Sequence, residues 1–195
     1  MEAAKKELIL EEAGKLFSRH GYKKVTIDEV AQGAGVAKGT VYLACDSKED
    51  LFYQVLHREL RAWTAAVART LDPRQPADRL LESMLETSIG FLETHLLVRD
   101  LMFGKTYSML PDWAERLQEL RALGLTNVVE ALNLGIKQKI FRSNVDVKLV
   151  ASLLQDLLYA SFLFHSHGAG RAQQLRERRG AGLDLILNGL RVRPL

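Results

Sequence analysis

The chain has 195 residues, of which 47% are hydrophobic and 26% are charged, as in an ordinary globular protein. Its net charge of +3 is too small to indicate nucleic-acid binding by bulk attraction, and its single cysteine excludes a disulfide framework. No apolar run reaches the ~18 residues that span a bilayer, and the first residues lack a signal-peptide core. We therefore expect a cytoplasmic protein with no membrane contact. Few β-branched runs occur, which favours an all-α fold.

The first expected element is an amphipathic helix near the N-terminus. Ile9, Ala13, Leu16 and Phe17 fall on one face of it. The helix is expected to end before Gly21, which can adopt the left-handed conformation of a C-cap.

Residues 26–48, TIDEVAQGAGVAKGTVYLACDSK, indicate two short helices joined by a turn. Thr26 and Glu29 form a T-x-x-E capping box that begins the first helix. Gly33 and Gly35 end it, and the second helix follows Val36. Two short helices around a glycine-containing turn are typical of the helix-turn-helix, whose second helix enters the DNA major groove. Ser47 then begins a fourth, longer helix.

This segment resembles the N-terminal domain of the TetR family of transcriptional regulators. The resemblance covers about 45 residues without a gap and rests on several spaced motifs. They are A-x-x-L-F-x-x-x-G-Y (Ala13 to Tyr22), T-I-x-x-V-A (Thr26 to Ala31), A-G-V-A-K-G-T-V-Y (Ala34 to Tyr42) and S-K-E-x-L (Ser47 to Leu51). It implies a three-helix DNA-binding head over residues 1–46 and a helical ligand-binding and dimerisation domain over residues 47–195.

The resemblance also implies roles for individual head residues. Lys38 and Thr40 are expected to contact base edges, while the helix N-terminus at Thr26, the Tyr42 hydroxyl and the Lys48 ammonium are expected to hold phosphates. Gly39 would let the helix approach DNA closely. The predicted DNA-binding residues are Thr26, Ala37, Lys38, Gly39, Thr40, Tyr42 and Lys48.

The chain departs from the family pattern at the recognition helix and its exit. Ala37 occupies the N-cap position and cannot accept a hydrogen bond through its side chain. Ala44 replaces a His or Tyr that could contact a phosphate, and Cys45 replaces a larger aromatic residue. We expect the corner around Cys45 to be looser, or filled by a neighbouring side chain.

The rest of the chain carries apolar patterns but no motif of chemistry. We expect helices over residues 47–70, 77–94, 98–107, 112–139, 146–165 and 171–190. The helix at 146–165 is apolar on two sides, so one side needs a partner beyond its own domain. The family resemblance implies a homodimer through the last two helices, which would present two heads to a palindromic double-stranded DNA operator.

The same helices would enclose an inducer site, for which an apolar or aromatic small molecule is the better expectation. Ordinary core packing would explain the same side chains. His165 and His167 could suggest a metal, but no Cys or paired carboxylate flanks them, so we expect no metal and no cofactor. The candidate lining residues are Trp63, Phe91, Met102, Phe103, Tyr107, Trp113, Tyr159, Phe162 and His165.

Three functions follow from these patterns. The first is a dimeric, ligand-responsive repressor. The second is a helical small-molecule-binding protein whose head has weakened or lost DNA binding, as Ala37, Ala44 and Cys45 would allow. The third, an all-α enzyme, lacks a recognisable catalytic set, so we expect that the chain is not an enzyme.

Overall fold

The computed structural model describes residues 3–102, 114–163 and 171–191, and within these ranges the chain is helical. The only β pairing there is a single antiparallel bridge between Phe141 and Arg191. The all-α prediction is confirmed. The helices are α1 (Ala3–His20), α2 (Ile27–Gly33), α3 (Lys38–Tyr42), α4 (Lys48–Ala68), α5 (Ala77–Thr94), α6 (Leu96–Met102), α7 (Ala114–Lys137), α8 (Val147–Leu163) and α9 (Arg171–Leu190).

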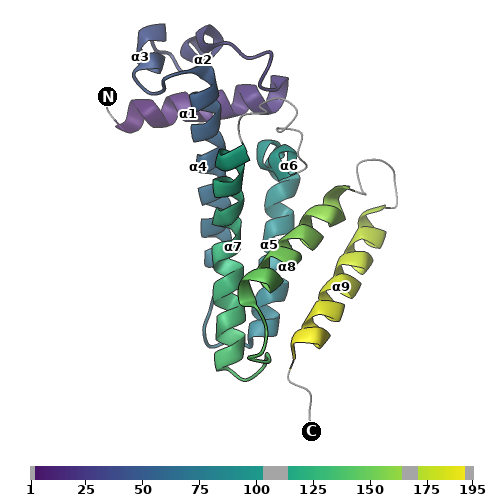
Figure 1. Ribbon diagram of the computed structural model, residues 1–195. Coiled ribbons are helices and arrows are strands. Elements are labelled where there is room, and N and C mark those ends of the chain that lie inside the picture. Colours follow the sequence, from purple (N-terminus) through teal and green to yellow (C-terminus); the bar gives the residue numbers. More distant parts are fainter. Residues whose placement is uncertain (1–2, 103–113, 164–170, 192–195) are drawn as a thin grey trace.

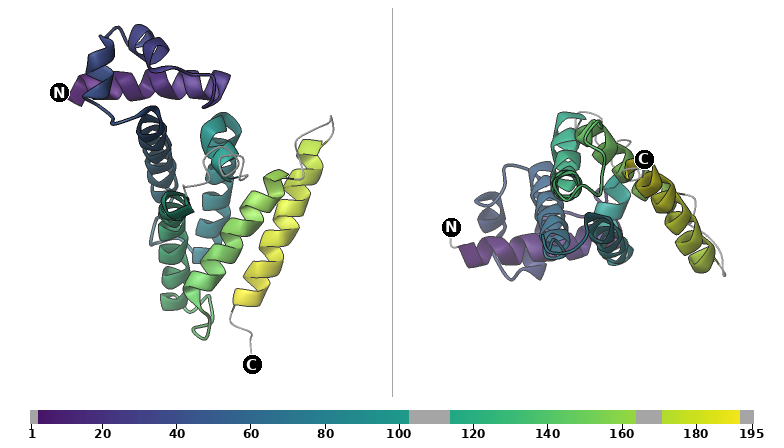
Figure 2. Two further views of the ribbon diagram at one scale, coloured as in Figure 1. Left: turned by 45° about the horizontal axis from the view of Figure 1, so that its top comes forward. Right: turned by 90° about the horizontal axis from the view of Figure 1, so that it is seen from below.

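The helices divide into a head and a body that share α4 (Figure 1). Helices α1 to α3 form the head, and α4 leaves it to run down the body. In the body α4 packs against α5 and α7, α8 packs against α7, and α9 lies outermost beside α8 (Figure 2). None of the described helices combines the length and the apolarity that a membrane span requires.

One apolar core runs from the head into the body. Phe17 and Val41 of the head are buried in it, and Leu51 and Leu60 continue it along α4. Helix α6 contacts both α1 and α4, which gives the body a second connection to the head. The boundary at residue 46 remains a prediction, because the core is continuous across it.

Local capping explains where several helices begin and end. The Thr26 side chain accepts from the Glu29 N–H in the predicted capping box, and Ser47 likewise accepts from the Asp50 N–H. Gly21, with φ of 77°, ends α1 in the left-handed conformation that glycine adopts without strain. The Thr26 and Ser47 side chains confirm the starts of α2 and α4, and the Gly21 backbone confirms the end of α1.

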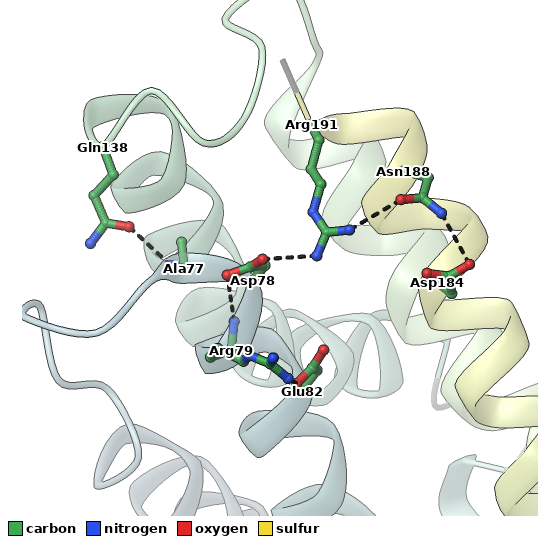
Figure 3. Close-up of polar contacts among 8 residues, drawn as sticks. All are labelled: Ala77, Asp78, Arg79, Glu82, Gln138, Asp184, Asn188 and Arg191. Atoms are coloured by element: carbon green, nitrogen blue, oxygen red, sulfur yellow. Dashed lines mark hydrogen bonds and ion pairs between the residues drawn. The ribbon is translucent and has the colours of Figure 1, made fainter. Parts of the chain in front are cut away.

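A polar cluster joins the end of α9 to the start of α5 (Figure 3). The Arg191 guanidinium lies 2.8 Å from an Asp78 carboxylate oxygen and donates to the Asn188 side-chain oxygen at 3.1 Å. Beside it, the Gln138 side-chain oxygen accepts from the Ala77 N–H at 2.9 Å. The Arg191–Asp78 contact attaches the C-terminal end of the outermost helix to α5, and the Gln138–Ala77 bond joins the end of α7 to the same place.

Candidate nucleic-acid interface

The α2–α3 pair is held by a small set of buried side chains. Val30 and Val41 are fully buried, and the Val36 N–H donates to the Ala31 carbonyl oxygen at 3.0 Å across the turn. Gly35, with φ of 66°, makes this turn possible. Because α3 packs on α2 through Val41, the opposite face of α3 is left exposed.

The exposed face carries four of the predicted contacts. Ala37, Lys38 and Gly39 are exposed, and Tyr42 keeps 49% of its surface accessible, whereas Thr40 is partly buried. A Cβ on Gly39 would meet no other part of the protein within 4 Å, so packing within the chain does not require glycine there. This face is therefore accessible, as the predicted DNA contacts require.

The Lys38 ammonium is bonded within the protein. It donates to an Asp28 carboxylate oxygen at 2.9 Å, and both side chains are largely exposed. The hydrogen bond with Asp28 raises the pKa of Lys38. A base or a phosphate that contacts Lys38 would therefore compete with this carboxylate for the ammonium group.

Thr26 performs the capping role that the sequence predicts. Its N–H donates to the Glu29 carboxylate at 2.7 Å, and its hydroxyl accepts from the Glu29 N–H at 3.3 Å. The backbone N–H of Thr26 holds the pKa of Glu29 below its ordinary value. The first turn of α2 therefore carries an ionised carboxylate. This negative charge would repel a phosphate that approaches the same helix end.

Lys48 lies at a different kind of site from Lys38. Its ammonium donates to the carbonyl oxygens of Tyr22 at 3.0 Å, Val25 at 3.1 Å and Lys23 at 3.4 Å. It also sits 4.6 Å from the centroid of the Tyr22 ring. Lys48 thereby fastens the α1–α2 turn to the start of α4, a role that the sequence analysis missed because it depends on residues 23 to 26 positions away.

Two of the three positions that depart from the family pattern are buried in the core. Ala44 and Cys45 are both buried, the Gln54 amide donates to the Ala44 carbonyl oxygen at 3.1 Å, and the Cys45 thiol donates to the Val41 carbonyl oxygen at 3.4 Å. Burial raises the pKa of the Cys45 thiol, which disfavours the reactive thiolate. Ala37 makes no side-chain hydrogen bond at the N-cap of α3, as expected.

Leu43 is a candidate contact that the sequence analysis did not select. It follows Tyr42 at the end of α3 and keeps 75% of its surface accessible. The sequence could have indicated this exposure, because Leu43 lies outside the helical spacing that makes Val36 and Val41 core residues.

Only part of the predicted inducer site lies within the described structure. Trp63 is buried in α4, and Phe91 is partly buried in α5, where its ring stacks on that of His95 with centroids 3.5 Å apart. The site as a whole remains a prediction. Phe103, Tyr107, Trp113 and His165 lie outside the described residues, as do the side chains of Met102, Tyr159 and Phe162.

The model of the family described as "Bacterial regulatory proteins, tetR family" matches residues 9–55, which include the whole helix-turn-helix. The chain belongs to the TetR family. It is therefore a DNA-binding transcriptional regulator with an N-terminal helix-turn-helix and a helical C-terminal part, as the resemblance implied.

Relatives of this TetR-family chain match over different lengths. The HTH-type transcriptional regulator YhgD of Bacillus subtilis is 35% identical over 97 residues, about half of each chain. The HTH-type transcriptional repressor KstR2 of Mycobacterium tuberculosis is 27% identical, with 93% of this chain and 90% of KstR2 covered. The structure of the fatty acid degradation regulator FadR of Bacillus halodurans has a TM-score of 0.75 at 19% identity, covering 99% of this chain and 100% of FadR.

Proposed function

We propose that the chain is a repressor that binds a palindromic operator as a homodimer and releases it when a small apolar molecule binds the body. The observation that carries the proposal is the exposed face of α3, held on a packed core with Lys38, Gly39 and Tyr42 accessible. KstR2, which matches over most of both chains, is named a repressor. A solved KstR2 is described as a ketosteroid regulator, and FadR as a regulator of fatty acid degradation, which supports an apolar effector.

A leucine stripe on α8 supports the homodimer. Leu149, Leu153 and Leu157 recur every four residues and keep 57%, 52% and 47% of their surfaces accessible. Leu185 of the neighbouring α9 is also exposed. Leucines one turn apart lie on one face of a helix, and burying them against a second copy would remove apolar surface from water. Two copies joined there would carry two heads for two half-sites.

The proposed response to ligand passes through α4 and α6. Both helices contact α1, so a change in their positions within the body would move the head. A ligand that binds one head spacing better than another shifts the population toward that spacing. The operator fits only one spacing, so ligand binding would lower DNA affinity.

Anisotropy with DNA from the region flanking the protein's own gene tests this function. We expect selective binding to a palindrome, a steep loss of affinity as salt rises, and weaker binding by Tyr42→Phe. Equal affinity for the palindrome and for scrambled DNA of the same composition would reject the repressor function.

A second function is favoured by one specific observation. Both predicted cationic contacts, Lys38 and Lys48, are bonded to acceptors within the protein. A small-molecule-binding protein with a weakened head would have this arrangement. The same titration separates the two functions, because the second one expects weak binding that does not depend on sequence.

A further inference from the structure

Helix α4 buries two polar atoms that have no hydrogen-bond partner. They are Oε2 of Glu59 and Nε1 of Trp63, and no other such side-chain atom occurs in the described parts of the chain. Trp63 is only 3% exposed. The two residues are one helical turn apart, about 6 Å along the axis, so their side chains extend from the same side of α4.

The two side chains face different neighbours, Glu59 the head and Trp63 the body. Glu59 faces α1, because a Cβ added to Gly14 would lie 3.6 Å from the other Glu59 carboxylate oxygen. The Trp63 ring faces α7 and α8, because a Cβ added to Gly124 would lie 3.1 Å from it and 2.7 Å from the Gln155 amide nitrogen. A molecule bound beside both side chains would touch α4, which runs from the head into the body.

Unpartnered polar atoms in a protein interior are uncommon, because a buried donor or acceptor without a partner loses its bonds to water. Burial raises the pKa of Glu59, against the opposing effect of His95 and Arg58. Glu59 offers an acceptor and the Trp63 indole a donor. A group that both donates and accepts, such as a hydroxyl, complements the pair, whereas a carboxylate would be repelled by Glu59.

We propose that the effector is an apolar molecule with a neutral hydroxyl-type end, which binds between Glu59 and Trp63. The inference rests on the proposed ligand response and adds the chemistry of the ligand. The hydroxyl donates to the Glu59 carboxylate and accepts from the Trp63 indole N–H. Molecules of the same shape that end in a carboxylate are disfavoured, because Glu59 repels the second negative charge.

Three probes with the same phenyl and butyl groups test the proposal: phenylbutanol, phenylbutyrate and butylbenzene. The full-length protein carries ¹⁵N-labelled tryptophan, and the NMR signal of the Trp63 indole N–H, assigned with Trp63→Phe, reports each titration. We expect phenylbutanol to bind most tightly and to shift this signal downfield. Butylbenzene should bind more weakly, and phenylbutyrate at least about tenfold more weakly than the alcohol.

Two variants and a control make the assignment specific. Glu59→Gln supplies an amide donor of the same size and should improve phenylbutyrate binding at least about tenfold. Trp63→Phe keeps an aromatic ring, so it should weaken the binding of phenylbutanol and leave the binding of butylbenzene unchanged. Calorimetry measures both affinities for this variant. Glu130→Gln, an exposed glutamate of α7, removes the same charge and should leave the order of the probes unchanged.

The proposal is overturned if phenylbutyrate binds as tightly as phenylbutanol, if Glu59→Gln leaves their relative affinities unchanged, or if none of the probes binds at millimolar concentration. Unchanged relative affinities in Glu59→Gln would mean that a buried water molecule, and not the ligand, forms hydrogen bonds to both atoms. Operator binding is measured separately on the ligand-free protein. If the protein does not prefer the alcohol over the carboxylate but still binds the operator, only this inference is rejected. If the protein does not bind the operator, the proposed repressor function is rejected.

Discussion

At the residue scale, Lys38 and Lys48 differ in how firmly protein acceptors hold them. Lys38 meets one exposed carboxylate, and ion pairs in water are weak, so a DNA group could replace Asp28. Lys48 donates to three carbonyl oxygens. A phosphate could bind the Lys48 ammonium only if the ammonium left these oxygens and so released the α1–α2 turn. The structure therefore favours Lys38 as the DNA contact and Lys48 as a positioning residue.

We predict that Asp28→Asn strengthens DNA binding by at least about twofold, because it removes a negative charge near the phosphates and releases Lys38. Anisotropy at low salt measures the change. Glu82→Gln removes the same charge from an exposed ion pair with Arg79 on α5 and should have no effect. Unchanged or weaker binding by Asp28→Asn would remove Lys38 from the interface.

For Lys48→Met we predict a free energy of unfolding lowered by about 1–3 kcal/mol, since three carbonyl oxygens lose a charged donor. Urea denaturation measures it, with Lys23→Met on the same turn as the exposed control. If Lys48→Met instead weakens DNA binding with unchanged stability, the phosphate contact expected from the sequence is correct.

Glu59 should make stability depend on pH. Burial raises its pKa above the ordinary 4.5, while Arg58 on α4 and His95 at the end of α5 oppose this. The folded protein thus binds this proton more tightly than the unfolded chain. The resulting stability is fully present below pH 4.5 and is lost as pH rises through the higher folded-state pKa.

Glu59→Gln cannot ionise, so we predict that it is about 1 kcal/mol more stable than the parent at neutral pH, with a flatter dependence of stability on pH. Thermal unfolding across the pH series measures both. Parallel curves for parent and variant would show that Glu59 ionises as readily in the folded protein as in the unfolded chain.

At the element scale, the helix ends that depend on local capping could be predicted closely. The expected helices at 77–94 and 171–190 match α5 and α9, and Asp146 accepts from the Leu149 N–H at the start of α8, as predicted. The helix expected at 98–107 begins instead at Leu96, within two residues of the end of α5. No turn residue separates α5 from α6 in the sequence, so this start could not be predicted.

Helix α3 is too short to form alone, and tertiary contacts stabilise it. Its N-cap, Ala37, has extended backbone angles but no side-chain acceptor. We predict that Ala37→Ser raises the free energy of unfolding by about 1 kcal/mol, because the hydroxyl can accept from an N–H of the first turn. Chemical denaturation measures it, with Ala37→Val as a control that adds a side chain without an acceptor. No gain over Ala37→Val would mean that packing alone sets the start of α3.

At the scale of the whole molecule, the exposed leucine stripe of α8 is the feature that a single chain leaves unexplained. We predict that Leu153→Glu gives a monomer and weakens operator binding at least about tenfold, because one head loses the second half-site. Light scattering and anisotropy measure the two effects. Leu96→Glu, an exposed leucine of α6, is the control. A Leu153→Glu protein that remains dimeric would place the interface elsewhere.

The sequence by itself determined most of the helical elements, the capping box of α2 and the helix-turn-helix, because these depend mainly on residues close together in the sequence. Tertiary structure alone decided what the polar side chains outside the helix caps do. The carbonyl oxygens around Lys48, the Asp28 carboxylate beside Lys38, and the burial of Glu59 with Trp63 all arise where segments distant in sequence meet. The charge and hydrogen bonding of a side chain depend on such neighbours, which local patterns do not specify.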